Sequence, residues 1–342
     1  MARVFVTRRL PGDGLAVLRD HEVVFGREDD CSLGPAELCA AAREADAIIC
    51  LLTDKIDLAV LEAGRDRLKV VANVAVGVDN VDLAAAEKLG IKVCATPGVL
   101  DETTADLAFS LILAASRLTA NAESDLRGGR WKGFRIVQFL GRDVHGATLG
   151  LVGYGRIAKA VARRAEGFGM RVLHHARRDT GCAGYCDALD AMLPQLDVLS
   201  LHVPGNSETR KLIDARRLAL LRSTAVLVNT ARGQVVDEEA LAIALEEGRL
   251  FAAGLDVYER EPEVHPRLLA APRTVLLPHI GSATLATRSE MVSLAASGVA
   301  QILSGQTPPN LVSGSDARQV GRGGGVGCRS RWFTVVSTKR VR

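Results

Sequence analysis

Leu149-Gly-Leu-Val-Gly-Tyr-Gly-Arg-Ile-Ala158 is the stretch that decides the fold class of this chain. An apolar run enters Gly153-x-Gly155-x-x-Ala158, and a helical stretch from Arg156 to Phe168 follows. The first glycine permits a tight turn, the second lets the backbone approach a pyrophosphate, and the third, small residue lets helix and strand pack closely. Because another apolar strand follows at Arg171–His175, the context favours a dinucleotide site at the helix N-terminus over a plain strand-to-helix turn.

Three polar side chains, Arg232, Glu261 and His279, each come just after an apolar run that is typical of a strand. The runs are Ala225–Asn229, Ala252–Val257 and Val275–Leu277. In an open parallel sheet the ligand lies beyond the carboxyl ends of the strands, so we expect the three side chains to converge on one crevice. They would supply an anion anchor, a proton donor or acceptor, and a carboxylate that holds the histidine, which together suit carbonyl reduction on an acidic substrate.

Each of these three residues also has a simpler interpretation. A histidine after a strand is often a capping or core residue, Glu261-Pro262 is compatible with a solvated turn, and Arg232 is compatible with an ion pair to an acidic neighbour. Their joint placement at strand ends favours the functional hypothesis.

The composition limits the class of protein. With 342 residues, 48% of them hydrophobic, the chain has room for about two domains. No apolar run approaches the ~20 residues of a membrane span, and the N-terminus is typical of a first strand rather than a signal peptide. The seven cysteines lie mostly in apolar stretches and lack zinc-ligand spacing, which indicates reduced thiols, no metal and a cytoplasmic protein.

The formal net charge of +3 comes from the C-terminal thirty residues. Residues 313–342 carry seven Lys and Arg against Asp316, and without them the totals of 43 basic and 40 acidic residues become 36 and 39. A nucleic-acid partner inferred from the overall charge would therefore be an artefact of this tail, and we expect none. The glycine-rich composition of the tail predicts disorder, and we assign it no function.

Alternating strands and helices in the first hundred residues predict a parallel sheet. Strands are expected at Val4–Thr7, Ala47–Leu52, Leu68–Asn73 and Lys92–Cys94, and helices at Gly14–Asp20, Pro35–Glu44 and Val81–Leu89. A second series of the same kind runs from Ala147 to Pro278.

Two long helices connect these series. The helix from Glu102 to Leu118, with Asp101 or Thr103 as its expected cap, is apolar on most faces, which predicts burial between two domains. The helix Leu285–Leu303 closes the body of the protein and is expected to cross back to the first domain.

Further motifs are dense along the chain: Val76-Gly-Val-Asp-Asn80, Thr96-Pro-Gly-Val-Leu100, Thr104-Ala-Asp-Leu-Ala108, Asn229-Thr-Ala-Arg-Gly233, Gly254-Leu-Asp-Val257 and Pro278-His-Ile-Gly-Ser282. With these and the motifs above, the chain from about Val4 to Val312 resembles the D-isomer-specific 2-hydroxyacid dehydrogenase family. Within that family it is most similar to the glyoxylate/hydroxypyruvate reductase branch.

The resemblance implies an α/β fold with two Rossmann-like parallel-sheet domains. Residues 1–99 with 286–312 would form a flavodoxin-like substrate domain, residues 100–285 the dinucleotide-binding domain, and residues 313–342 a tail without a family counterpart. It also implies a homodimer, because the helix from Glu102 is similar to the family's dimer-forming element.

The resemblance also implies reduction of a small 2-ketoacid, such as glyoxylate or hydroxypyruvate, to a D-2-hydroxyacid. Arg232 would hold the substrate carboxylate with its guanidinium fork, and backbone N–H groups of Val76 and Gly77 would complete the cradle. His279 would be the general acid. Glu261 would fix its tautomer and favour the protonated ring.

The residues that the resemblance assigns to the cofactor follow the glycine loop and the later strands: Gly153, Gly155, Arg156, Ile157, Ala158, Val203, Pro204, Thr230, Ala231, Asp256 and Gly281. Asp256 would bind the nicotinamide carboxamide. The alternative is a strand-end carboxylate that caps a turn.

The strand after the glycine loop bears on the choice between NAD and NADP. An NAD site usually has an acidic residue ~20 positions after the loop, where this chain has Ala176 followed by Arg177 and Arg178. A small residue followed by arginine suits a 2′-phosphate, so we expect NADP(H) to be preferred. The alternative is a solvated arginine loop with Asp179 binding the ribose of NAD(H).

The natural substrate stays open at this point. Trp131–Phe139 matches only in part the aromatic stretch that helps to wall the pocket in relatives, sometimes across a dimer interface. Alternative substrates are 2-ketoaldonates such as 2-ketogluconate, or phosphoglycerate. From a different class, a nucleotide-sensing corepressor would bind the cofactor with negligible turnover, and the intact Arg232, Glu261 and His279 set favours an enzyme.

Overall fold

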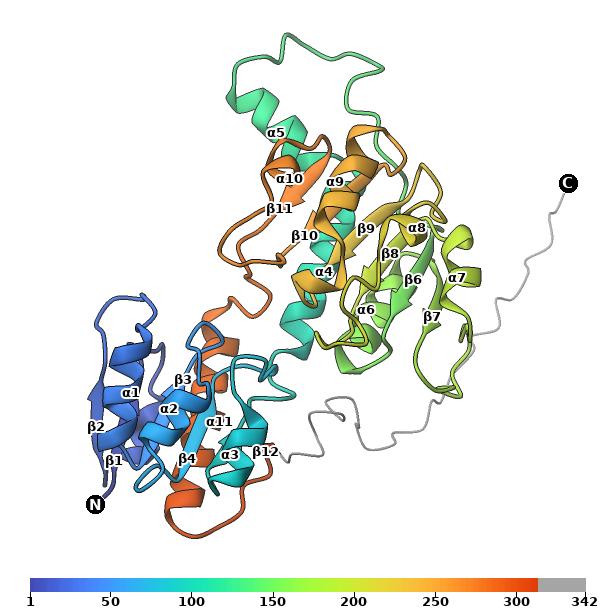
Figure 1. Ribbon diagram of the computed structural model, residues 1–342. Helices are drawn as coiled ribbons and strands as arrows, with labels where there is room; N and C mark the ends of the chain where they lie inside the picture. The colour runs from blue at the N-terminus through green and yellow to red at the C-terminus, as the bar shows by residue number, and fades with distance from the viewer. Residues whose placement is uncertain (313–342) are drawn as a thin grey trace, which may run out of the picture.

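The computed structural model describes residues 1–312, which form two lobes with one sheet of mostly parallel strands in each (Figure 1). Each sheet has six strands. The α/β class predicted from the alternating pattern is confirmed. The predicted disordered tail, residues 313–342, lies outside the described residues.

The sheet of the first lobe has the strand order β12-β5-β4-β3-β1-β2. Its strands are β1 (Arg3–Val6), β2 (Glu22–Phe25), β3 (Ala47–Cys50), β4 (Val70–Asn73), β5 (Lys92–Cys94) and β12 (Leu311–Val312). Apart from β12, which runs antiparallel to β5, the strands are parallel in the order 2-1-3-4-5 of flavodoxin-like folds.

The sheet of the second lobe has the order β11-β10-β9-β8-β6-β7 and is parallel throughout. Its strands are β6 (Thr148–Val152), β7 (Arg171–His175), β8 (Val198–Leu201), β9 (Val226–Asn229), β10 (Ala252–Leu255) and β11 (Thr274–Leu276). The strand order reverses between β6 and β8, where doubly wound sheets open a crevice for a ligand.

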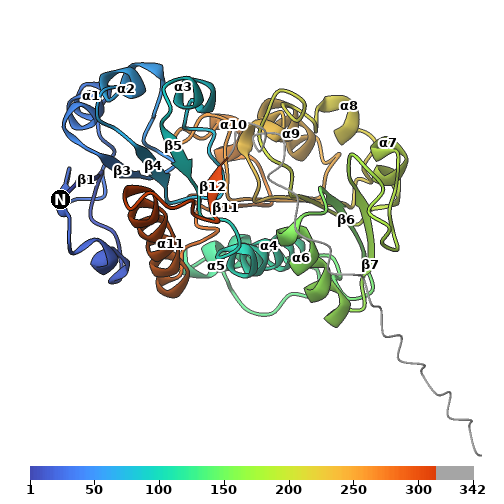
Figure 2. The ribbon, with the colours of Figure 1, turned by 90° about the horizontal axis from the view of Figure 1, so that it is seen from below.

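Helices cover both faces of both sheets (Figure 2). In the first lobe, α1 (Pro35–Glu44), α2 (Leu58–Ala63) and α3 (Leu83–Lys88) lie on one face, and α11 (Leu285–Leu303) with the 3-10 helix Gly14–Leu18 lies on the other. In the second lobe, α4 (Asp101–Ser116) and α6 (Arg156–Gly167) face α7 (Leu189–Met192), α8 (Ala215–Leu218) and α9 (Glu238–Glu246) across the sheet. Two shorter helices, α5 (Thr119–Arg127) and α10 (Pro266–Ala270), lie beside β11 and α9 respectively.

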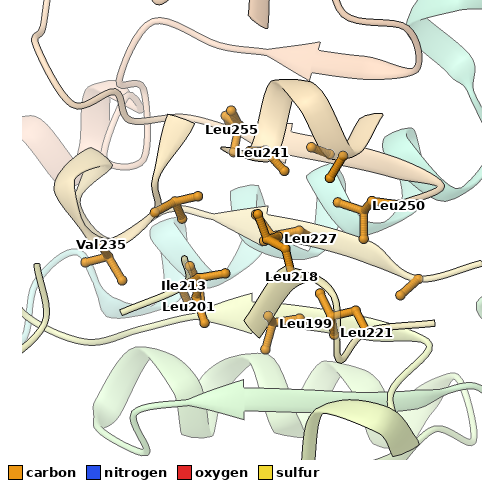
Figure 3. Close-up of a cluster of buried hydrophobic side chains, with 14 of the residues drawn as sticks. Leu199, Leu201, Ile213, Leu218, Leu221, Leu227, Val235, Leu241, Leu250 and Leu255 are labelled. Atoms are coloured by element: carbon orange, nitrogen blue, oxygen red, sulfur yellow. The ribbon is translucent and has the colours of Figure 1, made fainter. Parts of the chain in front are cut away.

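Burial on both faces explains why the central strands are continuous apolar runs. Successive side chains of a strand point to opposite faces, so Leu227 packs with Leu218 and Leu241 of the overlying helices (Figure 3), while Val226 and Val228 join the cluster under α4 and α6. The strands are thereby fixed in register and end at a common edge.

Most of the predicted elements are confirmed within a residue or two, including the return of α11 to the first lobe. Buried Ala295, Ala296 and Val299 of that helix belong to the cluster under the sheet, where α11 packs on β3, β4 and β5. Elements β2, α2, α5 and β12 were not predicted, because they are short or lie at sheet edges and carry weak periodicity. Strand β8 and helices α7 to α10 were expected only as part of the second series.

Two expectations for the helix after residue 100 were wrong. The N-cap is Leu100, whose side chain makes no capping bond; Asp101 instead pairs with Arg156, and the Thr103 hydroxyl lies 2.6 Å from that of Thr287. The helix is also not sandwiched between domains, since α4 packs on α6, β9 and β10 of the second lobe. An apolar helix surface indicates burial but not which sheet provides it.

Within residues 1–312, no helix is long and apolar enough to cross a membrane.

Candidate active site

One cleft lies between the lobes, at the carboxyl ends of strands from both sheets. Nearly all of the predicted site residues line it: Val76, Gly77, Gly153, Gly155, Ile157, Ala176, Arg177, Arg178, Val203, Pro204, Thr230, Ala231, Arg232, Asp256, Glu261, His279 and Gly281. Arg156 and Ala158 do not, because the Arg156 side chain turns toward Asp101 and Ala158 is buried under the sheet.

His279 and Glu261 form a hydrogen-bonded pair at the wall of the cleft. The His279 Nδ1 lies 2.7 Å from a carboxylate oxygen of Glu261, and each side chain keeps a little over a quarter of its surface exposed. The other ring nitrogen, Nε2, has no hydrogen-bond partner among the described residues, so it is available to a ligand. The predicted contact between these two residues is therefore present.

The Glu261 carboxylate is held in its ionised form. Burial by itself raises its pKa, but the hydrogen bond and charge of His279, the Tyr258 N–H and the Arg232 charge outweigh that effect and hold the pKa of Glu261 below its ordinary value. An ionised carboxylate can only accept a hydrogen bond, so Nδ1 is the N–H donor of this pair and the orientation of the ring is fixed.

Asp256 holds the turn that presents His279. The backbone of His279 has a positive φ of 53°, a conformation that costs energy for most residues other than glycine, although histidine tolerates it better than most. The His279 N–H donates to the Asp256 carbonyl at 2.9 Å, and the Ile280 N–H donates to the Asp256 carboxylate at 2.7 Å. Of the two interpretations offered for Asp256, the turn-capping contact is the one present, and the carboxamide contact stays a prediction.

Arg232 reaches across the cleft toward the first lobe. Its Nε donates to the Asp79 carboxylate at 2.6 Å, and its Nη1 donates to the Ala231 carbonyl at 2.8 Å. Its Nη2 lies so close to Gly77 that a Cβ at residue 77 would collide with it. The ion pair to an acidic neighbour, weighed above as a simpler interpretation, is thus present together with the placement at the cleft.

Val76 and Gly77 present free backbone donors beside that guanidinium. Among the described residues, none accepts a hydrogen bond from either N–H group. The loop is held from behind by the buried Asn73, whose amide donates to the Gly77 carbonyl at 2.8 Å. Two directed N–H groups next to a guanidinium form a cradle for a carboxylate.

The glycine loop has the geometry that a dinucleotide requires. Gly153 has a φ of +88°, and a Cβ there would press on the His202 carbonyl, so the turn needs glycine. A Cβ built at Gly155 meets nothing within 4 Å, which leaves open space at the start of α6. Because Gly155 caps α6 without a side chain, the first N–H groups of the helix are free for phosphate oxygens.

A buried hydroxyl and an arginine lie further along the same crevice. The Thr230 Oγ1 is buried without a protein partner among the described residues. After β7, Ala176 is followed by Arg177, whose guanidinium lies 3.3 Å from the Glu208 carboxylate. These observations fit a nicotinamide dinucleotide with its ribose near the end of β7, as the glycine pattern predicts.

Three further polar residues line this cleft that were not predicted from the sequence. Asp79 belongs to the motif Val76–Asn80, and as its one acidic residue it could have been singled out. Glu208 gave no signal in sequence. Tyr154, inside the glycine loop, stacks on the buried His174 with ring centroids 3.7 Å apart, a contact that only the pairing of β6 with β7 creates.

A dinucleotide cradle that opens toward a histidine poised for proton transfer defines the class of nicotinamide-dependent oxidoreductases. Comparison with known proteins makes this more specific. The family model described as D-isomer specific 2-hydroxyacid dehydrogenase, NAD binding domain, matches residues 109–281. The chain belongs to this family of oxidoreductases.

Individual relatives are similar to this chain over most of its length. A glyoxylate reductase of Thermococcus onnurineus is 42% identical over 320 residues, which cover 91% of this chain and 96% of that protein. A crystal structure of a protein from Thermus thermophilus superposes with a TM-score of 0.86 at 45% identity, covering 91% of this chain and all of that one. An NADPH-dependent glyoxylate/hydroxypyruvate reductase from Sinorhizobium meliloti, solved with NADP and malonate, has a TM-score of 0.79 at 35% identity, with coverage of 91% and 97%.

The Glu261→Gln variant should shift the pH dependence of reduction. In the wild type the contact with His279 is complete above about pH 4.5, the ordinary pKa of Glu261, and is lost as pH falls through the lowered value, so kcat/KM should decline there. Gln does not titrate, so the variant should lack this acid-side decline. Steady-state profiles of both proteins measure this, and superimposable acid limbs would disprove the partnership.

Proposed function

We propose that this chain reduces small 2-ketoacids, glyoxylate and hydroxypyruvate, to the corresponding D-2-hydroxyacids, with His279 as the proton donor. The observation that carries the proposal is the 2.7 Å contact between His279 and Glu261 on a cleft that also holds the Arg232 guanidinium and a dinucleotide-type glycine loop. The names of the relatives from Thermococcus onnurineus and Sinorhizobium meliloti support the choice of glyoxylate and hydroxypyruvate.

The chemistry follows from the charges around the cleft. Gly153, Gly155 and Thr230 would hold a nicotinamide cofactor, which would supply a hydride for the carbonyl carbon of the substrate. Arg232 and the N–H groups of Val76 and Gly77 hold the substrate carboxylate, which orients the carbonyl. The Nε2 of protonated His279 then gives its proton to the carbonyl oxygen, so that no alkoxide accumulates.

Replacing His279 by Ala should lower kcat for glyoxylate reduction by about 10²–10⁴, the usual contribution of general acid catalysis. Cofactor binding should persist, because the glycine loop is untouched. The readout is NADPH oxidation followed by absorbance, together with NADPH binding by fluorescence. A matched control is His145→Ala, an exposed histidine on the amino-terminal side of β6. Equal turnover by the His279 variant and the wild type would refute the assignment.

We further propose that NADP(H) is preferred over NAD(H). Support comes from Ala176, which leaves room where an acidic residue would repel a phosphate, and from Arg177 and Arg178 beside it on the cleft. The Sinorhizobium meliloti relative, described as NADPH-dependent, carries NADP in its structure. The exposed guanidinium of Arg177 can exchange its solvent-screened contact with Glu208 for a 2′-phosphate.

The Arg177→Ala variant should raise KM for NADPH by about tenfold or more, since a charge-assisted contact to phosphate is lost, and leave KM for NADH nearly unchanged. A suitable control is Arg249→Ala, another surface arginine paired with a glutamate, which lies on the amino-terminal side of β10. Initial rates over both cofactors provide the measurement. An equal rise in KM for NADPH and NADH would contradict the proposed contact between Arg177 and the 2′-phosphate.

A homodimer is the assembly we propose. The arm, defined as residues 126–140 at and after the end of α5, projects from the second lobe (Figure 1) and exposes large apolar side chains: Leu126, Trp131, Phe134, Ile136, Val137 and Leu140. Phe134 is 85% exposed and Ile136 76% exposed. An apolar patch of this kind commonly marks a protein interface, and a second copy of the chain is the partner that the family resemblance implies.

Phe134→Asp combined with Ile136→Asp should convert a dimer of about 73 kDa, twice the 36.3 kDa chain, into monomers. Buried aspartates without partners are costly, so the apolar contact cannot form. Light scattering after gel filtration gives the mass. The control Val17→Asp changes a half-exposed apolar residue of the first lobe. A wild-type monomer, or a double variant of dimer mass, would rule out this interface.

The compartment and the domain limits stay predictions. The thiols of Cys50 and Cys94 are buried, which raises the pKa of both, that of Cys94 to about 12, in keeping with unreactive thiols in a reducing cytoplasm. The proposed limits, residues 1–99 with 286–312 and residues 100–285, agree with the membership of the two sheets.

A further inference from the structure

Asp79 is a charged residue at the substrate end of the cleft whose role the proposed mechanism does not include. It lies in the loop after β4, in the first lobe, whereas its partner Arg232 follows β9 in the second. The Nε–Oδ2 distance is 2.6 Å, which makes this a direct ion pair across the cleft. Both side chains remain partly exposed, at 32% for Arg232 and 47% for Asp79.

We propose that Asp79 is a positioning residue that fixes the orientation of Arg232 for the substrate carboxylate. The inference rests on the proposed role of Arg232 as the anchor of that carboxylate.

The contacts of the guanidinium determine which edge faces a ligand. The Asp79 carboxylate accepts a hydrogen bond from Nε, and the Ala231 carbonyl accepts one from Nη1. These two bonds fix the plane of the guanidinium group. Nη2 then lies against Gly77 and donates to no acceptor among residues 1–312. The free N–H groups of Nη2 therefore lie beside those of the Val76–Gly77 loop. A substrate carboxylate placed there accepts hydrogen bonds from both.

Hydrogen bonds on both sides of Asp79 hold the loop that carries it. The buried Asn73 donates to the Gly77 carbonyl at 2.8 Å and to the Asn80 side chain at 2.9 Å. Asn80 in turn donates to the carbonyls of Leu51 and Asp54 at 3.0 and 2.9 Å. Because Asp79 lies between Gly77 and Asn80, its backbone is held in place, and a short acidic side chain on a fixed backbone can orient a long, flexible arginine.

A competing role for Asp79 makes the opposite prediction. A carboxylate on Arg232 could act as an internal substitute for the substrate, which would have to displace it. In that case removal of its charge would strengthen binding of an anionic substrate, because a competitor and a repelling charge would both be lost. A positioning role requires weaker binding and slower turnover, because the guanidinium loses its orientation.

The test compares Asp79→Asn and Asp79→Ala by kcat and KM for glyoxylate and by inhibition with oxamate. Asn keeps an oxygen acceptor for Nε, so we expect KM and the oxamate Ki to rise in the order Asp, Asn, Ala. The rise should reach about tenfold or more for Ala, with a fall in kcat. The Kd of NADPH and the melting temperature should change little, because the cofactor residues lie elsewhere on the cleft. Asp66→Asn, an exposed acidic residue of the same lobe, is the control.

Several outcomes would overturn the proposal. A fall in KM for either variant would indicate the competing role, and unchanged constants would show that Asp79 has no role. If the Ala variant melts markedly lower, the Asn variant, which is close in shape, decides alone. Arg232→Lys measured in parallel separates the two hypotheses: an unchanged KM for that variant would refute Arg232 as the anchor, whereas a raised KM with normal Asp79 variants refutes only the role of Asp79.

Discussion

Parallel strand pairing is the constraint on which the site depends. In a parallel sheet all carboxyl ends meet at one edge, so residues far apart along the chain are brought together without any direct attraction. Here two such edges face one cleft, which Arg232, Glu261 and His279 of one lobe line together with the Val76–Gly77 loop of the other, and Arg232 reaches that loop. Apolar packing on both faces of each sheet therefore positions the candidate site as well as stabilising the fold, because it fixes the strand ends.

The proposed proton donor, His279, is itself held in place by neighbouring residues. His279 occupies a left-handed backbone conformation that the protein maintains through two hydrogen bonds to the buried Asp256. Burial raises the pKa of Asp256 above its ordinary value, although the Ile280 and Gly281 N–H groups act to lower it, so the carboxylate depends on the turn that it holds. Such local strain is typical of functional sites, where surrounding contacts compensate for the cost.

How much of this was predictable depends on the range of the interactions involved. The strands and the glycine loop follow from local apolar pattern and glycine placement, and the Glu261–His279 pair follows from the rule that ligands gather at strand ends. The cap of α4 was not predictable, because Asp101 is diverted by Arg156 of another helix. Nor was the Asp79–Arg232 ion pair, since its two residues are 153 positions apart and come from different sheets. Sequence pattern therefore predicted the candidate site, whereas contacts between distant parts of the chain had to be observed.

The most direct test of the account is a crystal structure with NADP and oxamate, an unreactive analogue of a 2-ketoacid. The account predicts the oxamate carboxylate within hydrogen-bond distance of the Arg232 guanidinium and the Gly77 N–H, and its carbonyl oxygen next to the Nε2 of His279. An oxamate bound with its carboxylate away from Arg232, or with its carbonyl oxygen out of reach of His279, would contradict it.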